Sequence, residues 1–361
     1  MVNTVPTERN GITNVIFNLI SALKRNNIEI GYVAINNPDK NRRDVLEQIG
    51  AKLYVVPRKI YSPLSYVRTL SDISKKYDIV HAHGNSATLT LEMTAAKIGG
   101  VPVRIAHSHN TSCSMKIIDR LLRPIFYKLC NMRLACSNEA GKWLFRTRNF
   151  YVVNNGIDTT KFKFNEARRN QIRNKLNLQN YAVIGHVGNF DNAKNHPFIF
   201  EIFKELLSLN QNVRLLLLGD GAKREEYSKM VSDLKLSEHV LFMGSVDNPY
   251  DYMSAMDVIL MPSLFEGLPL TLVEEQANGL RCIVSDAITK EVDISGNVRF
   301  LSLQLSGRHW AEYINRELET PVDRSISSKN AISSIDNAEY SIDILADKLM
   351  RLYIEKLSYT S

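Results

Sequence analysis

Short runs of β-branched and apolar residues alternate along this chain with segments whose apolar residues recur every three or four positions. That alternation is typical of parallel sheets whose strands are joined by crossover helices. The expected strands are Glu29–Ile35, Lys52–Val56, Ile79–His83, Val103–Ala106, Arg133–Ala135, Ala182–Val187, Val213–Leu218, Val240–Phe242, Val258–Met261 and Arg281–Val284. The expected helices include Ile12–Leu23, His196–Leu209, Ala222–Leu234 and Leu270–Gly279. Because 361 residues exceed what one core usually supports, we predict an α/β protein with two Rossmann-like, doubly wound domains.

The boundary between the two domains is expected at Asn154–Lys163, where the string NNGID supplies turn chemistry. We therefore predict an N-terminal domain over residues 1–163 and a C-terminal domain over residues 164–337. Residues 338–361 have helical periodicity and are expected to cross back onto the first domain. Ligands of such sheets bind at the carboxyl ends of the strands, so the two domains are expected to face a central cleft.

The start of the chain is short for a doubly wound domain, whose first strand is central and buried on both faces. The first helix is expected near Gly11, which leaves only MVNTVPTERN before it, with Pro6 limiting any strand. We therefore expect a late start or a truncated chain, with a gap or a stub at the centre of the sheet. The alternative is that Val2–Val5 pairs as a short strand and the following loop reaches the cleft normally.

The composition excludes several classes of protein. With 44% hydrophobic and 23% charged residues, the chain can bury a core and is neither disordered nor collagen-like. No stretch approaches the ~18–20 consecutive apolar residues of a membrane span, and the N-terminus lacks the apolar core of a secretory signal. The four cysteines form no CxxC pair, which is typical of a reducing compartment. We therefore expect a cytoplasmic protein.

Charge is unevenly distributed along the chain. Residues 1–165 carry 24 Lys and Arg against 11 Asp and Glu, a net +13, whereas the rest carries 21 against 27, a net −6. A basic first half favours an anionic partner such as a membrane surface or a phosphorylated substrate. No nucleic-acid-binding signature accompanies the basic residues, so we expect no nucleic acid partner. Residues 114–133 interleave basic and apolar residues, which predicts either a helix at the membrane interface or a core helix with a solvated basic face.

Two carboxylates flank a helix start in the segment Ser263–Glu275. The segment follows the apolar run VILM, turns at Gly267 and starts a helix just after Leu268. The unpaired N–H groups and the dipole at a helix start favour a bound phosphate. Glu266 precedes this helix and Glu274 lies inside it, so the two side chains would address different parts of an extended ligand. The alternative makes Glu266 a cap and Glu274 a solvated helix residue.

A glycine loop with a lysine stands between a strand and a helix at Gly185–His196. Gly188 lets the backbone approach a phosphate closely, Asn189 follows it, and Lys194 places a cation near the helix start. Alone this pattern is weak, because glycine often follows a strand and a single lysine is usually solvated. The string LGDG, Leu218–Gly221, is another turn from strand to helix.

Two histidine pairs, His81 with His83 and His107 with His109, stand at or just past the ends of two strands. Such pairs raise the possibility of a metal site, but no Cys, Asp or Glu lies nearby at ligand spacing, so we expect none. Strand-end histidines are better suited to hydrogen bonds with ligand hydroxyl groups. A purely structural role is the alternative for His81 and His107.

These motifs resemble glycosyltransferase family 4, retaining enzymes with the two-domain GT-B fold, and most closely its bacterial capsule and exopolysaccharide members. The most specific match is Glu266, seven residues and Glu274 within FEGLPLTLVEEQANGL; the strings NGID, LGDG, FMG and SDAITKE also match. The resemblance implies that Glu274 binds the ribose of a nucleotide sugar and that Lys194 binds its diphosphate. It implies that Glu266 lies by the donor sugar and that His109, with His107 as the rival, lies near the anomeric centre, so Glu266 and His109 are the expected catalytic residues.

The resemblance also places backbone of Gly188, Gly267 and Leu268 in the donor site, and the loop at Gly11 near donor and acceptor. One position departs from the family, because many members have Arg where this chain has Asn189. Asparagine donates a hydrogen bond but carries no charge. Either the donor binds less tightly or another basic residue takes this role.

The implied reaction transfers a sugar from a nucleotide sugar, with a UDP-sugar as the expected donor, to a hydroxyl of a lipid-linked oligosaccharide in surface polysaccharide biosynthesis. Stabilisation of the departing diphosphate would be the main catalytic effect, and no metal or other cofactor would be required. The enzyme would work in the cytoplasm or peripherally at the inner face of the cell membrane. The alternatives are a nucleotide-sugar 2-epimerase, an inactive nucleotide-sugar-binding paralogue and a non-enzymatic scaffold.

Overall fold

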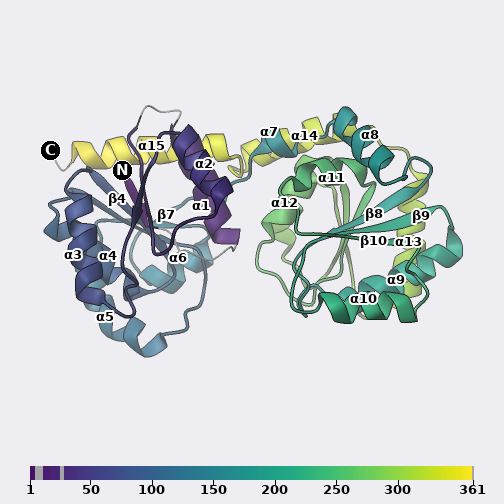
Figure 1. The fold of residues 1–361 in the computed structure, drawn as a ribbon, viewed down its shortest axis with the longest axis horizontal. Helices are drawn as coiled ribbons and strands as arrows, with labels where there is room; N and C mark the ends of the chain where they lie inside the picture. Colours follow the sequence, from purple (N-terminus) through teal and green to yellow (C-terminus); the bar gives the residue numbers. More distant parts are fainter. Residues whose placement is uncertain (5–10, 25–27, 360–361) are drawn as a thin grey trace. The chain divides into compact units, whose positions relative to one another are not determined.

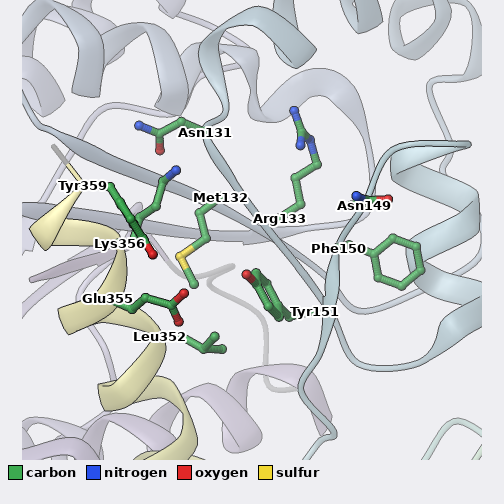
Figure 2. A pocket seen from close by; sticks show the side chains of 10 residues that line it. All are labelled: Asn131, Met132, Arg133, Asn149, Phe150, Tyr151, Leu352, Glu355, Lys356 and Tyr359. Atoms are coloured by element: carbon green, nitrogen blue, oxygen red, sulfur yellow. The ribbon is translucent and has the colours of Figure 1, made fainter.

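The computed structural model of this chain describes residues 1–4, 11–24 and 28–359. The chain forms two compact units, one of Met1–Gly156 with Glu339–Ser361 and one of Ile157–Ala338. Each unit is built on a parallel sheet flanked by helices (Figure 1). The α/β class and the two Rossmann-like domains predicted from the sequence are therefore confirmed.

The first unit has a seven-stranded sheet in the order β3-β2-β1-β4-β5-β6-β7. Its strands are β1 (Val2–Thr4), β2 (Gly31–Ala34), β3 (Lys52–Val55), β4 (Ile79–Gly84), β5 (Val103–Ser108), β6 (Met132–Ala135) and β7 (Tyr151–Val152). Its helices are α1 (Gly11–Leu23), α2 (Lys40–Gln48), α3 (Pro63–Ser74), η2 (Ala87–Leu89), α4 (Thr90–Ile98), α5 (Lys116–Leu129), α6 (Asn138–Phe145) and α15 (Ile342–Ser358). Apolar residues of α1 and α15 join one buried cluster of the sheet, and those of α3, α4 and α5 join another.

β1 occupies the centre of this sheet and pairs in parallel with both β2 and β4. It comprises only Val2–Thr4. Such a short central strand agrees both with a stub at the centre of the sheet and with the alternative of a short paired strand. The pairing sets Asn3 opposite His81. α1 begins at Gly11, but the loop before it, to which a role near donor and acceptor was assigned, lies outside the described residues.

The second unit has a six-stranded sheet in the order β10-β9-β8-β11-β12-β13. Its strands are β8 (Ala182–Val187), β9 (Val213–Leu218), β10 (Val240–Gly244), β11 (Val258–Met261), β12 (Arg281–Ser285) and β13 (Val298–Leu301). Its helices are α7 (Thr159–Phe162), α8 (Glu166–Lys175), α9 (His196–Leu209), α10 (Arg224–Asp233), α11 (Pro249–Ala255), α12 (Leu270–Ala277), η3 (Lys290–Val292), α13 (Gly307–Glu319) and α14 (Arg324–Asn337). Aliphatic side chains of β8, β9 and β11 pack with α9 and α13 in its core.

The boundary between the units lies at Gly156, within the predicted stretch Asn154–Lys163 but before the predicted domain end at residue 163. Asp158 caps α7, and α7 packs against α12 of the second unit. The side-chain amide of Asn278 also donates to the Phe162 carbonyl at 2.9 Å. These contacts tie residues 157–163 to the chain that follows. At the far end, the chain rejoins the first unit at Glu339, where the predicted segment begins at 338, and α15 packs against α1.

Among the described residues, no helix is both long enough and apolar enough to cross a membrane.

All the predicted strands are present, with ends that differ by at most two residues from those expected.

Candidate functional site

In the second unit the strand order reverses between β8 and β11, which is where open parallel sheets bind ligands. The loops leaving the carboxyl ends of these two strands meet each other. The N–H of Leu264 donates to the Ala193 carbonyl at 2.8 Å, and the Asn195 amide donates to the Pro262 carbonyl at 3.1 Å. The glycine loop and the segment with two carboxylates therefore belong to one site.

Lys194 and Glu266 form an ion pair in this site. The Lys194 Nζ lies 2.5 Å from Oε1 of Glu266, and the two side chains are only 15% and 16% exposed. Partly buried charges are screened less by salt than surface charges are. A phosphate that binds Lys194 must therefore displace Glu266 or share the lysine with it.

α12 starts directly after Pro269 and carries the second carboxylate, Glu274. Glu274 is half-buried, and no hydrogen bond or ion pair joins its carboxylate to another described side chain. Burial raises the pKa of Glu274 to about 8. The adjacent Glu275 is fully buried, neither of its oxygens has a hydrogen-bond partner, and burial raises its pKa well above the usual range. Sequence analysis assigned Glu275 no role, because only burial distinguishes it from a surface glutamate.

The loop at Gly188 packs directly against the LGDG turn. The N–H of Gly188 donates to the Leu218 carbonyl at 2.9 Å, and a Cβ on Gly219 would lie 1.9 Å from the Gly188 oxygen. The LGDG turn therefore holds the glycine loop in place and needs glycine to do so. A Cβ on Gly267 would meet nothing within 4 Å, so the backbone between Glu266 and Leu268 borders open space.

Asn189 is exposed in a hollow that Asp191, Asp220 and Lys223 also line. The Nζ of Lys223 lies 3.3 Å from the carboxylate of Glu226. Lys223 is thus a cation that lines the same hollow as Asn189, and it is paired with Glu226.

In the first unit the strand order reverses between β1 and β4, and four histidines gather beside this point. The register of β4 and β5 sets His83 opposite His107. Because alternate residues of a strand share a face, His81 and His109 lie on that same face. All four side chains are buried.

The four imidazoles form two hydrogen-bonded rows. In the first, the Tyr353 hydroxyl lies 2.7 Å from Nδ1 of His81, and Nε2 of His81 lies 3.1 Å from Nδ1 of His107. In the second, Nδ1 of His83 lies 3.0 Å from Nε2 of His109. Burial lowers the pKa of His81 to about 3 and that of His109 to about 4, so both rings are neutral at pH 7.

His109 and His107 differ in their position on β5. His107 lies within the strand, whereas His109 follows its last residue, Ser108. The Nδ1 of His109 lies 3.1 Å from Oδ1 of the half-buried Asn155. This position favours His109 over His107 as the residue nearer to a ligand.

Three of these histidines, His81, His83 and His107, bring ring nitrogens within 4.8 Å of one another, which is close enough to consider a metal. The rings of His81 and His83 are stacked, with centroids 4.1 Å apart and planes 25° apart. A metal ion lies in the plane of each imidazole that binds it, along the nitrogen lone pair, so one ion does not suit two stacked rings. The ring nitrogens other than Nε2 of His107 instead pair within the two rows.

A parallel α/β unit with a lysine and two glutamates at its switch point, joined to a second such unit, is the arrangement expected of a glycosyltransferase of the GT-B fold. The chain belongs to glycosyltransferase family 4. Residues 9–161 match the family described as Glycosyltransferase Family 4, and residues 168–334 match the one described as Glycosyl transferases group 1.

Similar proteins support this assignment. The chain is 33% identical to EpsF of Bacillus subtilis, which is named as a glycosyltransferase, and the match covers 85% of the chain and 84% of the relative. It is 29% identical to an Escherichia coli UDP-Gal:alpha-D-GlcNAc-diphosphoundecaprenol alpha-1,3-galactosyltransferase, and this match covers 78% of the chain and 76% of the relative. The crystal structure of Anabaena HepE in complex with UDP has 16% identity and a TM-score of 0.77, over 98% of this chain and 99% of that one. The predicted enzyme class and GT-B fold are confirmed.

Proposed function

We propose that this enzyme transfers a sugar from a UDP-sugar to a hydroxyl of a lipid-linked saccharide, with retention at the anomeric carbon, in surface polysaccharide biosynthesis. The observation that carries the proposal is the placement of Lys194, Glu266 and Glu274 at one switch point. Two similar proteins add to it: the Escherichia coli relative is named for UDP-Gal and a diphosphoundecaprenol acceptor, and HepE binds UDP.

The donor would lie across the carboxyl ends of β8 and β11. Lys194 and the N–H groups at the start of α12 would bind the diphosphate, since a cation and a helix N-terminus both favour phosphate. The carboxylate of Glu274 would accept hydrogen bonds from the ribose hydroxyls. Negative charge that develops on the departing UDP would then be stabilised by Lys194, without a metal ion.

Glu266 would change partners when the donor binds. Once the diphosphate takes over Lys194, the Glu266 carboxylate is available for hydroxyls of the donor sugar. His109, from the first unit, would act near the anomeric carbon. Both groups would thus contribute more to turnover than to donor affinity.

The acceptor lipid would meet the first unit at α5. Ile117, Leu121 and Ile125 form a stripe at four-residue spacing and are 78%, 71% and 52% exposed. Exposed Lys116 and Arg120 stand beside this stripe. An exposed apolar stripe with flanking cations fits an anionic lipid surface, because apolar burial and charge attraction act together there.

Vesicle flotation tests the lipid surface. The full chain should float with vesicles that contain anionic phosphatidylglycerol and not with neutral ones. A variant with Ser at positions 117, 121 and 125 should stay unbound, whereas Ile326→Ser, at an equally exposed site of the second unit, should float like the wild type. Equal binding to both kinds of vesicle, or by both variants, would contradict this part of the proposal.

Transfer itself is tested with the purified chain, a set of UDP-, GDP- and ADP-sugars and a synthetic polyprenyl-diphosphate saccharide. We expect mass spectrometry to detect a product from a UDP-sugar, and NMR of that product to show the anomeric configuration of the donor. UDP released in the absence of acceptor would indicate the epimerase instead. Binding of nucleotide sugars with no product would indicate the inactive paralogue.

A further inference from the structure

Four side chains from separate segments form one continuous hydrogen-bonded row. Asn3 in β1 presents Oδ1 at 3.2 Å from Nε2 of His83, and Nδ1 of His83 lies 3.0 Å from Nε2 of His109. The row ends at Asn155, whose Oδ1 lies 3.1 Å from Nδ1 of His109. Every ring nitrogen of the two histidines therefore has a partner in the row.

The number of hydrogens in this row is restricted. Three hydrogen bonds need three hydrogens, but two neutral imidazoles supply only two N–H groups. If both asparagines present oxygen, the third hydrogen must be an extra proton, and the buried pair of His83 and His109 carries a positive charge. Burial lowers the pKa of both rings, so this charge is disfavoured at pH 7. One asparagine must then present its NH2 group.

The unpartnered atoms identify which asparagine this is. Nδ2 of Asn3 is buried and has no hydrogen-bond partner. The two ends of an amide have nearly the same shape, so rotating Asn3 by half a turn brings Nδ2 to His83 without moving other atoms. The rotation leaves an oxygen without a partner in place of an N–H group, and such oxygens are the better tolerated of the two.

We propose that Asn3 is a positioning residue for His109: its amide donates to Nε2 of His83 and thereby sets both rings with hydrogen on Nδ1. His83 then donates from Nδ1 to Nε2 of His109, and His109 donates from Nδ1 to Asn155. Asn155 is the half-buried end of the row, so a ligand that reaches His109 there meets a hydrogen-bond donor and not a base. The consequence for ligand binding rests on the proposed function, whereas the tautomers do not.

Nitrogen NMR of the full chain, labelled with ¹⁵N-histidine, tests this assignment without donor or acceptor. Spectra of His83→Gln and His109→Gln assign the two rings. In the wild type we expect Nε2 of His83 to lack a hydrogen and Nδ1 of His109 to carry one. In Asn3→Asp the carboxylate accepts, so a hydrogen should move onto Nε2 of His83. In Asn155→Asp the end of the row already accepts, so both rings should keep their wild-type tautomers.

The outcomes separate this inference from the proposed function. A hydrogen on Nε2 of His83 in the wild type would overturn the inference, whether or not the variants fold. The same shift of hydrogen in both Asp variants would also overturn it. If the two histidines have the predicted tautomers but the chain transfers no sugar, the inference about Asn3 stands and the proposed function is refuted. An active Asn3→Asp variant should show a lowered kcat with UDP affinity unchanged.

Discussion

Replacing either member of the ion pair between Lys194 and Glu266 should change UDP binding in opposite directions. The two side chains are 15% and 16% exposed, and their charged atoms are 2.5 Å apart. Glu266 is paired with the cation to which the donor diphosphate is proposed to bind. Lys194→Met would remove that binding group, whereas Glu266→Gln would remove only the carboxylate that competes with the diphosphate.

The size of each effect follows from the kind of contact. A charge-assisted hydrogen bond is worth about 1.5–3 kcal/mol, so Lys194→Met should weaken UDP binding roughly 10- to 150-fold. An ion pair that is still partly solvated is worth about 1 kcal/mol, so Glu266→Gln should tighten UDP binding about fivefold. Turnover should fall in both variants, because Lys194→Met removes the cation proposed to stabilise the departing diphosphate and Glu266→Gln removes the carboxylate proposed to contact the donor sugar.

Titration calorimetry with UDP measures the two affinities, and a coupled assay for released UDP measures turnover. The double variant is the matched control: without Lys194, removal of Glu266 should bring no gain in affinity. Unchanged or weaker UDP binding by Glu266→Gln would show that the pair does not compete with the diphosphate. Full turnover by Glu266→Gln would remove this residue from the reacting part of the site.

Four further predictions concern pH, charge and metal. The pKa of Glu274 is about 8 in the folded chain against a usual 4.5. The free energy of unfolding of the wild type should therefore fall relative to that of Glu274→Gln as pH rises from about 4.5 to about 8. The same pH dependence in both chains, measured by urea unfolding, would contradict this. The pKa of His109 is about 4 in the folded chain against a usual 6.5. The contribution of its neutral ring to stability is therefore present above pH 6.5 and is lost as pH falls through 4. In the same assay, His109→Gln should lose less free energy of unfolding over that range than the wild type. Asn189→Arg should lower the KM for the donor severalfold, since a guanidinium adds a charged contact to phosphate; an unchanged KM would indicate that Lys223 already fills this role. Addition of EDTA should leave the transfer rate unchanged, and loss of activity restored by a divalent cation would show that Lys194 alone does not stabilise the leaving group.

The parallel sheets were predictable because buried strands have a strong sequence signal. β8, β9 and β11 are rich in apolar residues and buried over most of their length, and their predicted bounds match those observed. Two edge strands were not predicted, since β7 has only two residues and β13 has exposed positions. Their pairing depends on the neighbouring strand and not on their own composition.

The residues of the candidate site could be proposed one by one from the sequence, but the ion pair between two of them could not. Lys194 and Glu266 lie 72 positions apart, and each motif by itself allows a solvated side chain. Asn3 is a clearer case: it lies in a stretch judged only as a short strand, and 80 positions separate it from His83. Contacts of this kind come from the order of strands in the sheet, which local periodicity does not specify.

The distribution of charge gains a clearer meaning from the two sites. Lys194, proposed to bind the donor diphosphate, belongs to the acidic part of the chain, where residues 166–361 carry a net −6. Donor binding as proposed would depend on one lysine and a helix start, and it would not explain the net +13 of residues 1–165. In the first unit the switch point holds neutral histidines, which suit hydroxyl groups better than phosphate. Positive charge is exposed on the surface at Lys116 and Arg120 on α5, where the proposed anionic lipid surface would account for both the charge and the apolar stripe.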